Sequence, residues 1–332
     1  MKKFKCIFTF LLCIQFLNAQ DIHWSQFDHN PVLQNPVNVG QFNGDYRIHA
    51  NYRDQWRSVT VPFNTFSVSG EAKNVYKNLN IGAFIMTDVA GDGKYSTVEF
   101  QPSASYTLKL SSDSTHLIRP GLQFGLNFRS LNSDAFYFDN QWNGQYFDPN
   151  LATNETFDRE SRANFTVGVG LGYEFQKGKR ERIQLGIGLF NINQPDQGFF
   201  GQKVKRDMRL NLYARAEYKI GFDWDVLPSF QMNLQGTYRE FIIGSQIRYI
   251  LKDRLGEYRA VMAGIYSRTV DALFVSVGME YQNWWAGFSY DINYSDLTPA
   301  SNVRGGFEIS LRYIIHHFKP KKIQHRICPD YI

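Results

Sequence analysis

Histidines and acidic residues are the side chains of this sequence that could support catalysis or hold a metal ion. None of them falls into a zinc-protease, haem-attachment or local triad signature. His316 and His317 stand together in a basic tail, where solvated side chains are more common than a metal site. The stretch 88–93 has oxygen donors and glycines, but it lacks the spaced acids and final glutamate of a calcium loop. We therefore expect a hairpin loop there, and we expect no catalytic residue, cofactor or bound metal. The other histidines are His23, His29, His49, His116 and His325.

The first residues indicate export. Lys2, Lys3 and Lys5 precede an apolar run over 6–16, and Ala19 supplies a small residue for cleavage. The apolar run is shorter than the roughly 20 residues that a membrane-spanning helix needs. We expect a signal peptide over 1–19 and a mature chain that begins at Gln20.

Cleavage changes the charge and the cysteine content. It removes three lysines and no acids, so 33 basic residues face 31 acidic ones and the formal charge falls from +5 to +2. This balance gives no reason to expect a nucleic-acid partner. Cys6 and Cys13 leave with the signal, and Cys328 alone cannot form an internal disulfide or a cysteine-based zinc site.

Composition favours a barrel in the outer membrane. Aromatic residues make up 16% of the chain, yet the mean hydropathy is −0.38 and no later apolar run could span a membrane as a helix. A transmembrane barrel reconciles these facts, because its strands alternate lipid-facing apolar residues with lumen-facing polar ones. A soluble β-sandwich would also alternate, but long strands, glycine-rich polar faces and terminal aromatic residues favour the barrel.

The alternation is clearest over 164–175. Phe165, Val167, Val169 and Leu171 lie on one face, and the intervening positions are polar residues or glycine. The same period of two predicts an all-β, antiparallel transmembrane barrel of about 14 strands, within a range of 12 to 16. The predicted strands are 46–53, 65–72, 79–88, 96–109, 116–128, 164–175, 182–191, 207–219, 228–235, 239–250, 258–268, 273–281, 284–291 and 305–313.

The predicted strands divide the chain into four parts. A periplasmic or lumen-plugging segment covers 20–44, the barrel 45–313, and a basic tail 314–332, after the signal peptide over 1–19. For the first segment, the alternatives are that it plugs the lumen or that it covers the periplasmic mouth of the barrel. For the tail, with a net charge of +3, the alternatives are a docking segment and a passive tether.

Short predicted turns alternate with long links, which is typical of outer-membrane barrels with periplasmic turns and extracellular loops. The longest link, 129–163, is rich in aromatic residues and is our candidate for partner binding. Its aromatic residues are Phe136, Tyr137, Phe138, Trp142, Tyr146 and Phe147. Charged side chains are expected to face the lumen. They would either line an open channel or pair with one another, and so fill and stiffen the lumen. They are Arg209, Arg215, Glu217, Lys219, Arg248, Glu280, Glu308 and Arg312.

Several spaced motifs resemble the PorP/SprF family of type IX secretion system membrane proteins. The likeness is densest over 20–67 and returns at the end of the chain. Over 35–40 the sequence Asn-Pro-Val-Asn-Val-Gly replaces a more usual alanine-containing version. The motif residues are Ser25, Gln26, Phe27, Asn35, Pro36, Tyr52, Arg53, Gln55, Trp56, Pro62, Phe63, Cys328 and Pro329.

The resemblance implies an outer-membrane protein of Bacteroidota that acts with the secretion and gliding machinery. Its implied partners are membrane lipid, periplasmic machinery proteins and the C-terminal domain of a secreted adhesin or other cargo. It could be a core component or a dedicated adhesin partner. A passive porin or hydrophobic-solute channel is the alternative, and it predicts stable single-channel conductance or solute uptake and no secreted partner.

Overall fold

The computed structural model describes residues 22–57, 61–91, 93–155, 159–199, 203–254, 256–295 and 298–317. The predicted signal peptide, Cys328 and Pro329 lie outside these residues. The strands are β1 (Tyr46–Gln55), β2 (Phe63–Tyr76), β3 (Leu79–Ala90), β4 (Tyr95–Tyr106), β5 (Leu108–Lys109), β6 (His116–Ser130), β7 (Ser161–Gln176), β8 (Glu181–Phe190), β9 (Arg209–Lys219), β10 (Trp224–Gln235), β11 (Tyr238–Arg254), β12 (Glu257–Arg268), β13 (Ala272–Tyr281), β14 (Trp284–Asn293) and β15 (Arg304–Ile315).

Helical turns are few and short in the described residues. They are η1 (Phe27–His29), α2 (Pro31–Gln34), η2 (Pro36–Asn38), η3 (Ser133–Ala135), η4 (Asp139–Gln141) and α3 (Thr298–Ser301). None of the helices in the described ranges has the length and apolar character needed to cross a membrane.

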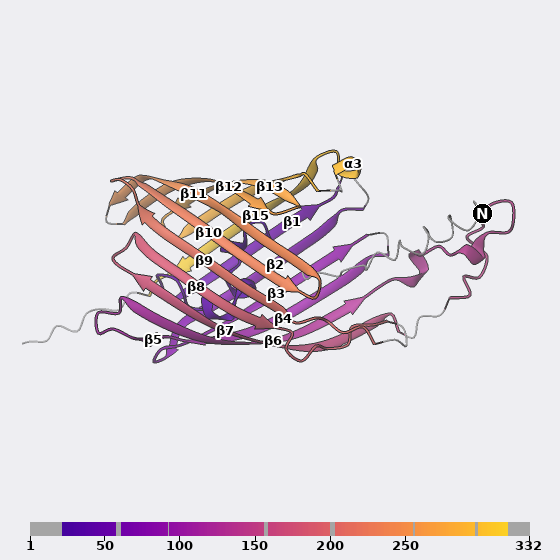
Figure 1. Cartoon of the computed structure of the whole chain (residues 1–332), viewed down its shortest axis with the longest axis horizontal. Helices are drawn as coiled ribbons and strands as arrows, with labels where there is room; N and C mark the ends of the chain where they lie inside the picture. The colour runs from indigo at the N-terminus through magenta and orange to yellow at the C-terminus, as the bar shows by residue number, and fades with distance from the viewer. Residues whose placement is uncertain are drawn as a thin grey trace, which may run out of the picture.

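Fourteen antiparallel strands close into a barrel, which confirms the predicted fold and strand number (Figure 1). β1 pairs with β15, with Tyr46 opposite Ile315, and β4 pairs with β6, with Ser96 opposite Ser130. The predicted strand 96–109 is interrupted at Thr107. β4 ends at Tyr106, and β5 pairs with β6 outside the ring.

The two ends of the barrel differ. β1 begins and β15 ends at what we call the turn end, which carries tight links such as 77–78 and 282–283. The opposite end, here the loop end, carries the three longest links, 131–160, 191–208 and 294–303, and lies to the right in Figure 1.

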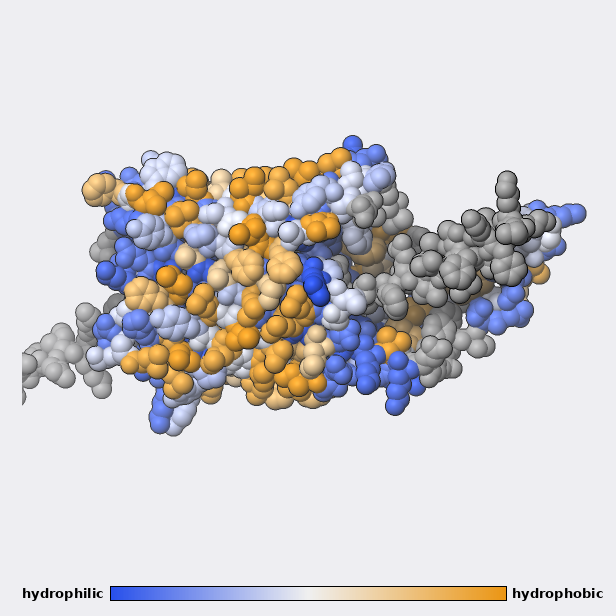
Figure 2. Space-filling view, viewed as in Figure 1, coloured by the Kyte–Doolittle hydropathy of each residue, from blue (hydrophilic) through white to orange (hydrophobic). Residues whose placement is uncertain are grey.

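The outer surface of the wall is apolar. Leu171, Ile243, Val277 and Ile309 are each at least half exposed on it, and Figure 2 shows orange side chains over much of the barrel wall. Their neighbours along the strands point inward, because successive side chains of a strand alternate between faces. Glu174 and Glu308 are buried there, as the alternation predicted.

The core lies between the wall and the N-terminal segment 22–44, which we call the plug. Trp24, Val32, Leu33 and Val39 of the plug pack with Phe84 and Met86 of β3. Phe27 packs with Ile242, Tyr266 and Phe274 of β11, β12 and β13. Nearly every plug residue from Trp24 to Phe42 is buried. The described plug residues therefore pack against the inner face of the strands.

The plug runs antiparallel to β1. Ile22 and His23 border a cavity at the loop end together with Gln55 and Trp56. At the other end of the plug, the carbonyl oxygen of Phe42 accepts a hydrogen bond from Lys73 Nζ (2.6 Å). The chain therefore passes through the lumen from the loop end to the turn end before it enters the wall at Tyr46.

Candidate functional site in the plugged lumen

The first anchor of the plug is Ser25, which is held by charged side chains of the wall. Its hydroxyl donates to Asp291 Oδ1 (2.7 Å), and its backbone N–H donates to Glu308 Oε2 (2.8 Å). Arg53 joins the two carboxylates through Asp291 Oδ2 (2.9 Å) and Glu308 Oε2 (3.0 Å), and its side chain is 1% exposed. Two motifs that are distant in the sequence, around Ser25 and around Arg53, thus meet at one point.

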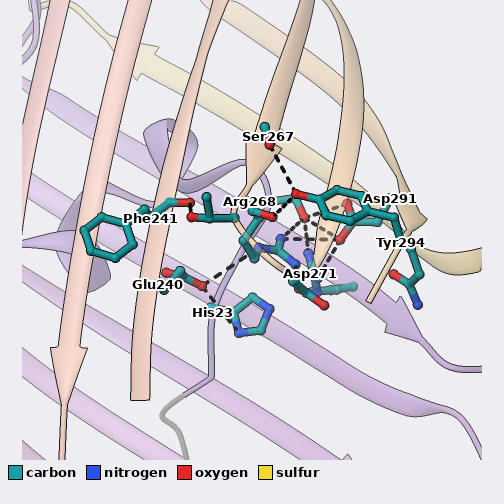
Figure 3. Close-up of polar contacts among 12 residues, drawn as sticks. His23, Glu240, Phe241, Ser267, Arg268, Asp271, Asp291 and Tyr294 are labelled. Atoms are coloured by element: carbon teal, nitrogen blue, oxygen red, sulfur yellow. Dashed lines mark hydrogen bonds and ion pairs between the residues drawn. The ribbon is translucent and has the colours of Figure 1, made fainter. Parts of the chain in front are cut away.

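Arg268 extends this anchor toward the loop end (Figure 3). It donates to Ser25 Oγ (2.8 Å) and to Asp271 Oδ2 (2.7 Å), and it lies 3.8 Å from Glu240 Oε2. His23 Nδ1 lies 3.9 Å from the same Glu240 oxygen. Removing charges from water is costly unless they are paired, and here each carboxylate faces an arginine. The arrangement fixes the plug in the lumen.

The second anchor lies near the turn end. Glu71 accepts from Arg47 Nε (2.7 Å) and Nη2 (2.8 Å), and its Oε2 also accepts from the backbone N–H of Gly40 (3.0 Å). Gln41 donates to Glu174 Oε2 (3.2 Å), which also pairs with Arg119. The plug is therefore fastened to the wall at both ends of its path.

Glycines on the wall make room for the middle of the plug. A Cβ at Gly121 would lie 2.8 Å from the carbonyl carbon of Pro36, and one at Gly170 would lie 2.4 Å from Asn35 Oδ1. A Cβ at Gly172 would come within 2.8 Å of Val37. The glycine-rich polar faces seen in the sequence thus accommodate the Asn-Pro motif.

The other family-motif residues of the barrel support the wall itself. Tyr52 donates to Asn64 Oδ1 (2.8 Å), and Asn64 in turn donates to the carbonyl oxygen of Pro62 (3.4 Å). The rings of Trp56 and Phe63 meet edge to face at 4.7 Å, across the first loop-end link. Gln55 lies beside the guanidinium of Arg53. Gln26 donates to the backbone of Glu308 (3.0 Å), and Phe27 packs as described above.

The inward charges predicted from the sequence are mostly paired. Glu217 pairs with Arg248, Glu280 with Arg312 and Glu308 with Arg53. Arg215 lies 3.6 Å from Asp28 of the plug. Arg209 stacks over the Phe190 ring at 4.4 Å, whereas Lys219 is exposed near the Phe222 ring (5.8 Å). In the described residues, this pattern favours a filled lumen over a charged open channel.

The aromatic link is separate from the lumen. It covers 131–160, because β6 and β7 extend into the range 129–163 predicted for it. Figure 1 shows it projecting beyond the loop end. Gln141 is buried and donates to the carbonyl oxygens of Pro149 and Leu151 (3.3 Å each). These bonds order the link around its own backbone.

The aromatic side chains of this link are largely exposed. Tyr137, Trp142 and Tyr146 are 70%, 57% and 59% exposed. The Tyr137 and Phe147 rings meet edge to face at 5.0 Å, and Trp142 forms an isolated bridge with Phe147. Phe136 lies against Gly93, and Phe138 is half-buried.

A second loop-end link, 191–208, is tied to β7. Asp196 accepts from the backbone N–H groups of Gly198 (3.2 Å) and Val204 (2.8 Å) and from Arg162 Nη2 (2.6 Å). Hydrogen bonds from these donors hold the pKa of Asp196 below its ordinary value, and the backbone N–H of Gly198 contributes most. The charged carboxylate therefore stabilises this link beside the mouth.

Sequence reasoning missed the wall partners of Ser25 as a site. Glu308 is predicted to face the lumen and Asp291 ends the predicted strand 284–291, but alternation does not show which plug residue lies opposite either of them. Arg268 and Glu240 gave no separate signal. No cluster of three or more potential metal ligands occurs in the described residues.

Solved structures with a similar fold include outer-membrane channels. The toluene transporter TodX of Pseudomonas putida aligns with a TM-score of 0.50 at 7% identity, covering 89% of this chain and 94% of that chain. A FadL homologue of Pseudomonas aeruginosa gives 0.47 at 10% identity, covering 87% and 94%. The monoaromatic hydrocarbon channel CymD gives 0.47 at 10% identity, covering 87% and 93%. At these identities the likeness concerns the fold alone. No curated protein matches the chain.

The sequence comparison is more specific than the fold. The family model described as type IX secretion system membrane protein PorP/SprF matches residues 16–313, which include the plug, thirteen strands of the ring and all but the last two residues of β15. The chain therefore belongs to the PorP/SprF family.

Proposed function

We propose that this protein is a type IX outer-membrane barrel that supports export and surface attachment of a large adhesin or other cargo, whose C-terminal domain it binds at the loop end. In this proposal the turn end faces the periplasm and meets the secretion or gliding machinery. The proposal includes no enzymatic activity.

The exposed aromatic surface of link 131–160 carries the proposal. Tyr137, Trp142 and Tyr146 expose large rings outside the apolar belt of the wall. Tyrosine and tryptophan are enriched at protein interfaces, because they bury much area while retaining a polar group. The hydrogen bonds of Gln141 order the link before it meets a partner, which lowers the entropy lost on binding.

The plug supports a binding role over passive diffusion. Buried side chains occupy the lumen from Trp24 to Phe42, and ionic anchors hold both ends of this path. A porin needs a continuous aqueous route, whereas binding at the rim does not. We therefore expect low single-channel conductance from the full protein in planar bilayers.

The test replaces Tyr137, Trp142 and Tyr146 together with serine. Cargo is defined as the surface proteins that disappear when the gene is deleted, measured by mass spectrometry of proteins shaved from intact cells. We expect the triple variant to lose at least three quarters of this cargo from the surface, because the interface loses its largest rings.

Val270→Ser is the control. This side chain is 82% exposed at the same loop end, but it belongs to the link between β12 and β13 and not to link 131–160. Heat-modifiable gel migration verifies that each variant forms the barrel. Normal surface cargo in the folded triple variant would contradict the binding role of the link. High, steady conductance of the full protein would favour the porin alternative.

A further inference from the structure

The cavity that Ile22 and His23 border at the loop end has a volume of about 430 Å³. Volumes of this size are typical of ligand sites. Of the described plug residues, only these two line it. Val204 and Lys205 of link 191–208 also line it and are exposed, so the cavity communicates with solvent. The described plug therefore leaves room for a ligand at this end of the barrel.

Asp88 of β3 places a buried carboxylate on the wall of this cavity. The residue is 8% exposed, and its Oδ1 accepts a hydrogen bond from the Thr65 hydroxyl (2.6 Å). Among the described residues, no second hydrogen bond and no ion pair involves this carboxylate. Buried charges in proteins are ordinarily paired. The free oxygen of Asp88 thus lacks the cation that a buried carboxylate normally has.

The basic residues that line the cavity do not supply this cation. Arg206 pairs with Glu99 (3.0 Å), and Arg129 donates to a glutamine side chain. Lys205 is exposed and forms no ion pair with Asp88 within the described ranges. Acidic and basic residues line the cavity in equal number, so the need for a cation is local to Asp88.

Aromatic rings lie on both sides of Asp88. In the strand register, Thr65 of β2 and Thr97 of β4 lie opposite Asp88. Phe63 and Tyr95 are each two residues nearer the loop end, are half-buried and line the same cavity. Diagonal neighbours of this kind lie about 7–8 Å apart. The carboxylate is therefore flanked by two rings whose surfaces border the same space.

We propose that this cavity binds the alkylammonium group of a lysine side chain of the cargo, an inference that rests on the proposed function. Aromatic ring faces attract cations, and aromatic pockets are a known means of binding ammonium groups. Because Thr65 engages Oδ1, one oxygen of Asp88 remains, which suits the compact charge of lysine better than the paired N–H donors of arginine. A divalent metal ion would need several oxygen ligands.

The aromatic link lies next to this site. The Asn132 N–H donates to the carbonyl oxygen of Gly93 (3.0 Å), and the Phe136 ring lies against the same glycine. Gly93 belongs to the link 91–94, which joins β3 to β4. A partner that covers the exposed rings of the aromatic link would therefore lie beside the cavity that holds Asp88.

The experiment measures binding of Nα-acetyl-lysine methylamide to the full protein in detergent, by saturation-transfer NMR at low ionic strength. We expect saturable binding of this probe and little binding of the uncharged Nα-acetyl-norleucine methylamide. Asp88→Asn should weaken binding about tenfold, because the asparagine keeps an acceptor for Thr65 but carries no charge. Tyr95→Leu, which removes one ring, is a second variant should the first fail to fold, and it should weaken binding several-fold.

Asp139→Asn is the matched control. It removes the same charge from an exposed side chain at the loop end that does not line the cavity. Affinity for the lysine probe should be unchanged in this variant. Absence of saturable binding overturns the proposal, and so does equal affinity of the wild type and a folded Asp88→Asn variant. Equal binding of the norleucine probe, or tighter binding of Nα-acetyl-arginine methylamide, overturns the assignment to lysine.

The role of the cargo is tested separately in intact cells. Asp88→Asn should lower the surface cargo at least twofold, because the partner loses one charged contact. Normal surface cargo in this variant, together with weakened probe binding, overturns the assignment of the lysine to the cargo. Failure of the proposed function is distinguished from this result, because it appears as normal cargo in the triple variant of Tyr137, Trp142 and Tyr146.

Discussion

At the scale of single residues, the plug depends on ion pairs that are removed from solvent. Arg53 lies between Asp291 and Glu308, and Ser25 bridges the same two carboxylates. A buried pair stabilises little relative to an apolar replacement, but loss of one partner leaves an uncompensated charge. The anchor therefore specifies where the plug sits more than it adds to stability.

Arg53→Gln tests this role. The substitution leaves the carboxylates of Asp291 and Glu308 facing each other, so we expect a loss of about 3–5 kcal/mol in the free energy of unfolding. Urea unfolding in lipid vesicles, followed by tryptophan fluorescence, measures it. The triple variant Arg53→Gln, Asp291→Asn, Glu308→Gln should recover part of the loss, and a single variant as stable as the wild type would contradict the anchor.

The residues of this anchor were only partly predictable. Ser25, Gln26 and Arg53 stood out through the family resemblance, and alternation placed Glu308 on a lumen-facing position. Their meeting depends on how strands β1, β14 and β15 come together with the plug. Sequence separations as large as the 283 residues between Ser25 and Glu308 leave no local signal.

At the scale of elements, the strands were predictable because a period of two is a local property of each segment. All fourteen strands of the ring were found, with ends shifted by a few residues. The position of the plug could not be predicted, because its short helical turns show no periodic pattern of apolar residues. The glycines of β6 and β7 that face the plug were visible as a pattern in the sequence. The plug residues that fill the space beside them could not be predicted.

Gly121→Ala tests the fit between plug and wall. The added Cβ would lie 2.8 Å from the carbonyl carbon of Pro36 and from the Val37 nitrogen, and backbone atoms cannot move aside as a flexible side chain does. We expect the plug to shift and single-channel conductance in planar bilayers to rise several-fold. Gly70→Ala is the control, since nothing lies within 4 Å of its added Cβ. Equal conductance in both variants would contradict the close fit.

At the scale of the whole molecule, the barrel has its polar side chains inside and its apolar ones outside. Val277 of β13 is 56% exposed on the wall, whereas the adjacent Ser276 is buried in the lumen. A soluble protein would be expected to bury the valine. A lipid-facing wall explains the reversed order.

Val277→Arg tests this placement. An arginine near the middle of the bilayer costs about 2–4 kcal/mol, and a position in water costs far less. We expect that loss in urea unfolding from lipid vesicles. Val270→Arg is the control, since this side chain is 82% exposed in the loop-end link between β12 and β13. Equal stability of the two variants would contradict a lipid-facing Val277.

The seam between the first and last strands has a consequence for assembly. Arg53 of β1 stands directly opposite Glu308 of β15, and plug atoms of Ser25 and Gln26 bond to that same glutamate. A barrel closed without the plug would bury this glutamate without three of these hydrogen bonds. We therefore expect closure of the barrel and insertion of the plug to depend on each other.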